Sequence, residues 1–571
     1  MNKEYLIEYK LNQYENDKEN YKNGRFKKVA VYAKYIKQDE PTYQNNELIE
    51  ALPPLKNMEN VFDLLEKTPI YSDFERQKNP LYRLHAVYRL EEYLFPISKH
   101  FEIEQNIAIA IRRGYINKKI FSKEHIKNLR KLSVIMNSNA SDFRQYINTH
   151  LLSINDAPSA NGFSIIGVSG GGKSTAVDNI LSFYPQHIIH LTDGDKKFLF
   201  HQLTYLKIEC TYNGNIKGLC QKFFSSVDDV LGTDYFLKYG GARSNIDRMI
   251  IAIAHISLKH GLGLLVIDEI QHLKSLKNKG SDAALNFFVT LMNEIKLPTI
   301  FIGTYKAIET LSYDFRQSRR TNGIGIVEMN YLEREEFDIL LEDLWEFQWV
   351  KNKCKLTDEL RECMFNNTMG ILDVIIKLFI AVQVEAIRSE KDTITGSLIN
   401  RIAKDKFPFV KKIIDSIRDK NYDALKNYED LKNPWYDELL DNTKTILEDR
   451  EKVRQIQNGE ERKSKLKEKE LANNLCIFLE EMGYEYINVE DVVLEVIKKH
   501  GKNKDISFLK KEVAKKLLQI SSITNGNQDN NKNHKIKNGQ NKNKDINRYD
   551  SYDEFIEENK KGLIEGITEE V

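Results

Sequence analysis

The stretch of sequence that decides the fold is residues 162–181, GFSIIGVSGGGKSTAVDNIL. It fits the pattern GxxxxGK[ST], and the residues at the fixed positions are Gly167, Gly172, Lys173 and Ser174. The apolar residues before the glycines predict a strand, and the amphipathic residues after Lys173 predict a helix. A strand, a glycine-rich loop and a helix in this order predict a phosphate-binding loop of the Walker A type.

Each part of this loop has a chemical role in binding a nucleotide. Glycines let the backbone wrap closely around a phosphate with several N–H groups pointing inward, and the helix N-terminus adds positive potential. Lys173 is expected to reach the β- and γ-phosphates, and Ser174 to hold Mg²⁺ through its hydroxyl. The alternative is a glycine-rich turn with a surface lysine, which a second motif disfavours.

That second motif lies at residues 262–273, LGLLVIDEIQHL. Its apolar run predicts a buried parallel strand that ends in Asp268 and Glu269, at the carboxyl edge where open α/β sheets bind ligands. Asp268 is expected to hold Mg²⁺ directly or through water, and Glu269 to act as the general base on the attacking water. The alternative is an ordinary acidic helix N-cap after a strand.

Two further segments supply candidate residues. The strand at 298–303, PTIFIG, is followed by Thr304, which either senses the γ-phosphate or is a simple turn residue. The segment at 313–325, YDFRQSRRTNGIG, carries Arg319 and Arg320. These arginines either reach the γ-phosphate of a neighbouring subunit as an arginine finger or form a solvated surface patch.

The pattern around these motifs is that of an α/β fold. From about residue 160, short β-branched runs alternate with amphipathic stretches, which predicts a parallel sheet covered by helices. The predicted strands are 163–167, 187–191, 203–209, 262–269 and 298–303.

Helical periodicity follows at residues 333–405, where Trp345 and Trp349 are expected on one face of a single helix, as part of a packed core. Nearer the N-terminus, residues 29–36 alternate like a strand. Residues 107–116 predict a helix that stops near Gly114.

The composition narrows the functional class. Lys and Arg number 85 and Asp and Glu 84 among 571 residues, so the net charge is +1, and any contact with nucleic acid must come from a local patch. No run of about 18 or more uncharged apolar residues occurs, so neither a membrane-spanning helix nor a membrane partner is expected. The five cysteines lack metal-binding spacing and predict reduced thiols in a cytoplasmic protein.

Four segments together resemble the TnsC-type AAA+ ATPases, which regulate heteromeric transposons and are related to the TniB, MuB and IstB transposition ATPases. They are GVSGGGKST at 167–175, LLVIDEIQHL at 264–273, IFIGTYKA at 300–307 and DFRQSRR at 314–320. NELIEALPP at 46–54, TYLKIECTYNGNIKGLCQKFF at 204–224 and TMGILDVIIKLFIAVQ at 368–383 are also similar to that family. The resemblance covers about residues 30–390.

The resemblance implies an AAA+ P-loop ATPase core that binds ATP and Mg²⁺. Carried over residue by residue, the ATP-binding residues are Gly167, Val168, Ser169, Gly170, Gly171, Gly172, Lys173, Ser174 and Thr175. The metal-binding residues are Ser174 and Asp268, and the catalytic residues are Lys173, Glu269, Thr304, Arg319 and Arg320. Lids of AAA+ proteins often place an arginine near residues 368–376, whereas here Asp373 and Lys377 are the nearest charges, so a lid sensor acting in cis is not expected.

The resemblance also implies a function. Such proteins are ATP-dependent switches that assemble as rings or filaments on duplex DNA and link a target-site selector to the transposase. A helicase loader or replication initiator is the alternative within the same fold, and it would need a DNA-reading appendage. A signalling NTPase switch is a further alternative, which normally carries a repeat array after the lid. Neither feature is apparent in the sequence.

The expected domain order has six parts. They are an N-terminal α+β appendage that binds the target selector (1–150), the AAA+ core (151–332), a helical lid (333–405), a C-terminal helical region (406–525), a disordered linker (526–548) and an acidic tail (549–571). The tail has an apolar helical face formed by Tyr552, Ile556, Leu563 and Ile567. This face is expected to dock on a transposase subunit, and the alternative is a solubilising acidic tail.

Overall fold

The computed structural model describes residues 26, 30–116, 118, 126–127, 129–130, 132–133, 162–193, 196–210, 215–242, 244–275, 296–308, 325–389, 391–418, 471–472, 474–476, 478–479, 489–500, 506–526 and 548–549. Among the helices in these ranges, none combines the length and the apolar character that crossing a bilayer requires.

The central sheet has five parallel strands in the order β6–β7–β8–β3–β9. Their bounds are β3 Phe163–Gly167, β6 Tyr205–Glu209, β7 Leu264–Asp268, β8 Thr299–Gly303 and β9 Gly325–Met329. The strands β3, β7 and β8 are buried along their whole length, which is why their sequences read as continuous apolar runs. Because all five strands run the same way, the residues that follow β3, β7 and β8 meet at one edge of the sheet.

Helices cover both faces of this sheet, and alternate residues of one strand enter two different cores. Leu264 and Val266 of β7 pack with α6 and α9, whereas Leu265 and Ile267 pack with α10 and α12. The bounds of these helices are α6 Ser98–Tyr115, α9 Lys173–Leu181, α10 Ile216–Leu231 and α12 Ile246–Lys259. A short helix, α11 (Tyr235–Tyr239), lies against α10. The predicted α/β layering is therefore present.

A smaller sheet lies beside the central one and contains β1 Ala30–Tyr32, β4 His187–Asp193 and β5 Lys196–Leu203. β1 is parallel to β4, and β4 and β5 form an antiparallel hairpin. The sequence predicts β4 but not β5. The chain passes from β5 to β6 with only Thr204 between them, so the strand predicted to begin at residue 203 begins at Tyr205.

The predicted strand at 29–36 is two short strands with different partners. β1 pairs with β4, whereas β2 (Tyr35–Ile36) pairs in parallel with β10 (Arg548–Tyr549). Arg548 was expected in the linker and Tyr549 in the tail, and residues 527–547 and 550–571 of these two predicted segments lie outside the described residues.

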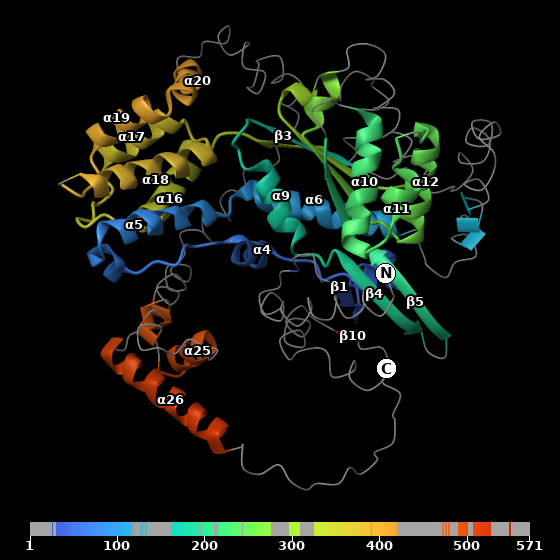
Figure 1. Cartoon of the computed structure of the whole chain (residues 1–571), viewed down its shortest axis with the longest axis horizontal. Helices are drawn as coiled ribbons and strands as arrows, with labels where there is room; N and C mark the ends of the chain where they lie inside the picture. The colour runs from blue at the N-terminus through green and yellow to red at the C-terminus, as the bar shows by residue number, and fades with distance from the viewer. Residues whose placement is uncertain are drawn as a thin grey trace.

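Five helices follow the sheet, the first four over the predicted lid and the fifth in the predicted C-terminal helical region, and Figure 1 shows them gathered at one end of the molecule, away from α10 and α12. They are α16 Arg334–Trp345, α17 Asp358–Thr368, α18 Leu372–Arg388, α19 Gly396–Lys406 and α20 Pro408–Arg418. Further along, α25 (Val489–His500) and α26 (Ile506–Gly526) have an apolar core of their own, shared with Leu475 and Leu479. Residues 419–470 lie outside the described residues.

The N-terminal segment packs on the lid and shares its core. Its short elements are η1 Pro41–Tyr43, α3 Glu47–Glu50, α4 Met58–Leu65, η2 Asp73–Gln77, α5 Pro80–Ala86 and η3 Val87–Glu92. α5 and η3 contact α18. Arg83 of α5 donates to Trp349 O at 3.0 Å and forms an ion pair with Asp392 at 2.7 Å, and both side chains are buried. Residues 30–116 are thus built into the body of the molecule, and the domain boundaries stay predictions.

Two helix predictions are corrected. The helix α6 ends at Tyr115, next to Gly114 as predicted, but it begins at Ser98, nine residues before the predicted start at 107. Gly114 lies against Pro298, whose side chain would be 2.6 Å from an added Cβ. Trp345 and Trp349 do not share a helix, since α16 ends at Trp345. Both side chains are nevertheless buried in the core, as predicted, and Trp349 Nε1 donates to Glu75 Oε2 at 2.8 Å.

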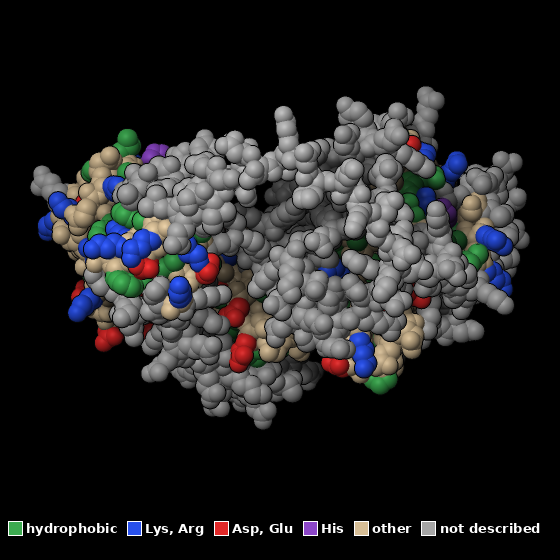
Figure 2. Space-filling model, turned by 90° about the horizontal axis from the view of Figure 1, so that it is seen from below, with side chains coloured by type: hydrophobic (Ala, Val, Ile, Leu, Met, Phe, Trp, Pro, Cys, Tyr) green, Lys and Arg blue, Asp and Glu red, His purple; other side chains and the backbone are tan. Residues whose placement is uncertain are grey.

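Charges of both signs are interspersed on the described part of the face that Figure 2 shows. This distribution agrees with a net charge of +1.

Candidate nucleotide-binding site

The loop between β3 and α9 is shaped by its glycines. At Gly167 a Cβ would lie 1.7 Å from Met329 O of β9, so no side chain fits. Gly172 precedes the first residue of α9 with a φ of +83°, in the left-handed region that favours glycine. The loop therefore turns sharply from the strand into the helix, and the N-terminus of α9 faces the space beyond the sheet edge.

Lys173, the first residue of α9, reaches back across this loop. Its Nζ donates to Gly167 O at 3.0 Å and to Val168 O at 2.7 Å. These contacts hold the ammonium group at the loop, where the phosphates of a nucleotide would meet it.

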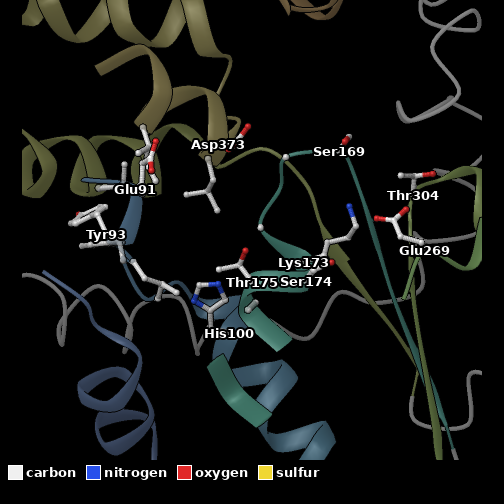
Figure 3. A pocket seen from close by; sticks show the side chains of 18 of the residues that line it. Glu91, Tyr93, His100, Ser169, Lys173, Ser174, Thr175, Glu269, Thr304 and Asp373 are labelled. Carbon is white, nitrogen blue, oxygen red and sulfur yellow. The ribbon is translucent and has the colours of Figure 1, made fainter. Parts of the chain in front are cut away.

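The loop opens into a cavity of about 590 Å³, a size typical of small-molecule sites. The predicted residues that line it are Ser169, Gly170, Gly172, Lys173, Ser174, Thr175, Glu269 and Thr304. Four predicted residues are buried and do not line the cavity: Gly167, Val168, Gly171 and Asp268. Arg319 and Arg320 are outside the described residues. Figure 3 shows Lys173, Ser174, Glu269 and Thr304 on one side of the cavity and Glu91, Tyr93 and His100 on the other.

The second side of the cavity was missed by the sequence analysis. It is formed by the N-terminal residues Glu91, Tyr93, Leu94, Phe95 and His100 and by the lid residues Leu340, Leu372, Asp373 and Ile376. Leu372, Asp373 and Ile376 belong to the segment 368–383 that resembles the family, but none of them was predicted to line the site. No motif marks the N-terminal residues, and Tyr93–Phe95 reads simply as an apolar run before a proline. Most of these side chains are apolar, so this half of the cavity suits the flat ring of a nucleobase.

His100 is a polar group in this apolar half. Burial lowers the pKa of its imidazole to about 4, so the ring is neutral near pH 7. Its Nδ1 accepts a hydrogen bond from Ile97 N at 3.2 Å. This bond assigns the proton to Nε2, which makes the other ring nitrogen a donor.

The acidic pair follows β7, as predicted, but its two carboxylates have different surroundings. Asp268 is buried, and its Oδ1 accepts from Glu269 N at 2.9 Å while its Oδ2 lies 3.1 Å from Lys207 Nζ. Glu269 is partly exposed and enters the cavity (Figure 3). Asp268 is thus held in the interior by its neighbours, whereas a ligand in the cavity can reach Glu269.

Gln271 links Glu269 to the end of β8. Its Nε2 donates to Glu269 Oε2, and its Oε1 accepts from Thr304 N at 3.2 Å. The hydroxyl of Thr304 is buried and has no hydrogen-bond partner among the described residues. An unsatisfied hydroxyl at the wall of a cavity is suited to bind a ligand oxygen.

The lid touches the loop directly. Asp373 N, in the first turn of α18, donates to Gly170 O at 3.1 Å. The Asp373 carboxylate pairs with Lys377 Nζ at 2.6 Å. The charged side chain that the lid places at the cavity wall is therefore the Asp373 carboxylate, paired with Lys377.

The residues present fit a magnesium ion by their donor chemistry. The Ser174 hydroxyl lines the cavity, the Asp268 carboxylate lies behind it, and oxygen atoms of these kinds are the ligands that Mg²⁺ prefers. The unpartnered Thr304 hydroxyl is a further oxygen beside the same edge.

A match to a protein-family model identifies the fold. Residues 159–311 match the family model described as an AAA domain. The fold is that of an AAA+ P-loop ATPase core. The predicted fold class is confirmed, and the narrower relation to TnsC-type regulators stays a prediction.

Several solved structures are similar to part of the chain. A Walker-type ATPase of Pyrococcus abyssi has 13% identity and a TM-score of 0.31, with 54% of this chain and 78% of that chain covered. ORC1 of Aeropyrum pernix in complex with DNA has 13% identity and a TM-score of 0.30, with 50% and 64% covered. The RuvB Holliday junction branch migration motor of Thermotoga maritima has 14% identity and a TM-score of 0.23, with 50% and 70% covered. Comparison with curated proteins finds no match.

Proposed function

We propose that the chain is an ATP-hydrolysing AAA+ regulator of DNA transposition. In its ATP-bound state it assembles as rings or filaments on duplex DNA and recruits transposase there. Hydrolysis then releases the assembly. The proposal places this activity in the cytoplasm, where the target DNA lies.

The observation that carries the ATPase part is the convergence of Lys173, Glu269 and Thr304 on one cavity. A phosphate-binding cation, a carboxylate and a free hydroxyl come from three different elements and face the same space. The apolar wall on the far side supports binding of the base, with His100 Nε2 as a donor to one of its acceptor atoms.

The chain's own groups account for the steps of hydrolysis. Lys173 and the loop N–H groups hold the phosphates and stabilise the charge that develops on them. Thr304 binds an oxygen of the γ-phosphate, and Glu269 accepts a proton from the attacking water. Gln271 keeps that carboxylate turned toward the cavity. Bound Mg²⁺, held by Ser174 and Asp268, would neutralise phosphate charge.

The transposition part of the proposal rests on the sequence segments that resemble TnsC-type regulators. Under this proposal Arg319 and Arg320 act on the nucleotide of a neighbouring subunit, which makes hydrolysis depend on assembly. Residues 1–150 bind the target selector, and the acidic tail at 549–571 binds a transposase subunit. Charge complementarity supports a basic groove on that subunit as the receiving surface.

Negative-stain imaging of the full chain with duplex DNA tests the proposal. With a non-hydrolysable ATP analogue we expect rings or filaments on the DNA, and with ADP or with the Lys173→Ala variant we expect none. Isolated monomers in the presence of the analogue would contradict the proposal. Assembly confined to one DNA sequence and persisting in high salt would favour a replication initiator instead.

A further inference from the structure

Lys207 lies in the middle of β6 and contacts two carboxylates from two other elements. Its Nζ is 2.7 Å from Asp178 Oδ1 of α9 and 3.1 Å from Asp268 Oδ2 at the end of β7. The exposed fractions of the three side chains are 21% for Lys207, 57% for Asp178 and 8% for Asp268. The lysine thus joins a surface acid to a buried one.

The alternation of β6 explains why the ammonium group lies there. Leu206 and Ile208 point into the core beneath α10, so Lys207 between them points to the opposite face, which α9 covers. A lysine on a covered face needs an anionic partner, because burying an unpaired charge is costly. Asp178 and Asp268 meet that need.

This contact has a consequence for the metal site. Asp268 is the carboxylate expected to hold Mg²⁺, yet it does not line the cavity, and both of its oxygens have partners: Glu269 N and Lys207 Nζ. The carboxylate therefore already has a cation when no metal is bound. Binding of Mg²⁺ at Asp268 has to weaken the contact between Asp268 and Lys207, because the ion and the ammonium group repel each other.

We propose that Lys207 is a positioning residue that sets the magnesium requirement of the site. In the metal-free protein it neutralises Asp268 and holds it at the end of β7. When Mg²⁺ arrives with the nucleotide, the ammonium moves its contact toward Asp178, which is the alternative partner 2.7 Å away. This inference rests on the proposed binding of Mg²⁺ and ATP in this cavity.

Two variants should change the magnesium requirement in opposite directions. Lys207→Met removes the competing cation, so half-saturating Mg²⁺ for binding a fluorescent ATP analogue should fall about 10-fold. Asp178→Asn removes the alternative partner and leaves the ammonium on Asp268 alone, so half-saturating Mg²⁺ should rise about threefold. Lys238→Met is the matched control, because it also breaks a Lys–Asp pair, one on the exposed surface of α11. This control variant should leave half-saturating Mg²⁺ unchanged.

Thermal unfolding without metal gives a readout that does not depend on activity. The Lys207→Met variant leaves the buried Asp268 carboxylate without a cation, so the unfolding midpoint in EDTA should fall, and Mg²⁺ with nucleotide should raise that midpoint more than in the parent. Lys207→Arg keeps a cation on β6 and should behave like the parent in both measurements. Asp178→Asn changes an exposed side chain, so it stays folded and tests the proposal even if Lys207→Met does not fold.

The outcomes separate this inference from the proposed function. Half-saturating Mg²⁺ within twofold of the parent in both Lys207→Met and Asp178→Asn would overturn the role of Lys207 while leaving the ATPase proposal intact. A parent protein that binds no nucleotide at any Mg²⁺ concentration would overturn both.

Discussion

Glu269 has a backbone φ of +57°, a left-handed conformation that residues with a side chain seldom adopt. Such a conformation persists when surrounding contacts hold it in place. Here Asp268 accepts the Glu269 N–H, and Gln271 donates to the Glu269 carboxylate. The candidate base is therefore held in the cavity by its neighbours.

Replacing Glu269 with Gln should separate binding from hydrolysis. The amide cannot accept the proton of the attacking water, so the hydrolysis rate should fall about 100-fold or more, whereas ATP affinity should change little. Phosphate release and binding of a fluorescent ATP analogue measure the two properties. Hydrolysis at the parent rate would mean that another group is the base.

Gln271→Ala should slow hydrolysis without weakening ATP binding. Loss of the amide frees both the Glu269 carboxylate and the Thr304 N–H, and a base misplaced by about 1 Å loses on the order of 10- to 100-fold in rate. We expect kcat to fall by that factor and KM for ATP to stay within about threefold. A rise in KM with an unchanged kcat would show instead that Gln271 contacts the nucleotide.

Individual site residues could be predicted from the sequence only where a motif marks them. Lys173, Glu269 and Thr304 follow predicted strands, and parallel strands bring their carboxyl ends together. The role of Lys207 could not be predicted, because its partners depend on the register of β6 with β7 and on the placement of α9. His100 was missed because it is 73 residues from Lys173 in sequence and no motif connects the two.

At the scale of elements, four of the five strands of the central sheet, β3, β6, β7 and β8, were predicted, whereas β9 of that sheet and β5 of the smaller sheet were missed. β3, β7 and β8 are buried throughout and were found. β9 is only partly buried and follows an arginine-rich stretch, and β5 begins with two lysines. Trp349 was placed in α16 because its spacing from Trp345 is helical, although burial against Tyr71, not helix geometry, fixes its position.

The ion pair between α5 and the lid should stabilise the contact of these elements. Arg83→Met leaves Asp392 buried without its partner, and breaking such a pair typically destabilises a protein by about 3–5 kcal/mol. Urea unfolding measures the change. Lys353→Ala is the control in the same lid, because Lys353 pairs with Glu346, whose side chain is largely exposed. Exposed ion pairs contribute about 0–1 kcal/mol to stability. A similar loss in the two variants would contradict the importance of the buried pair.

At the scale of the whole molecule, the N-terminal segment is a structural part of the nucleotide site. It supplies one wall of the cavity and binds the lid through Arg83. The predicted N-terminal appendage at 1–150 stays a prediction, and the contacts of its described residues with the lid could not be predicted because nothing in the sequence signals them. A partner that binds the N-terminal region could therefore act on the lid and on the nucleotide through direct contacts.

The acidic tail should be required for recruitment and dispensable for the core. Deleting residues 550–571 leaves β10 in place, so ATP hydrolysis and assembly on DNA should be unchanged. Pull-down of transposase subunits should be lost, because the apolar face of the tail is gone. Full recruitment by the shortened chain would contradict the role of the tail, and loss of hydrolysis would show that the tail belongs to the folded body.

The central claim is that nucleotide in this cavity controls binding to duplex DNA, and fluorescence anisotropy of labelled duplexes tests it most directly. A non-hydrolysable ATP analogue should raise the affinity of the parent chain about 10-fold or more, with little sequence preference and a steep decline as salt rises. The analogue should have no effect on Lys173→Ala. Equal DNA affinity of the parent with and without nucleotide would contradict the account.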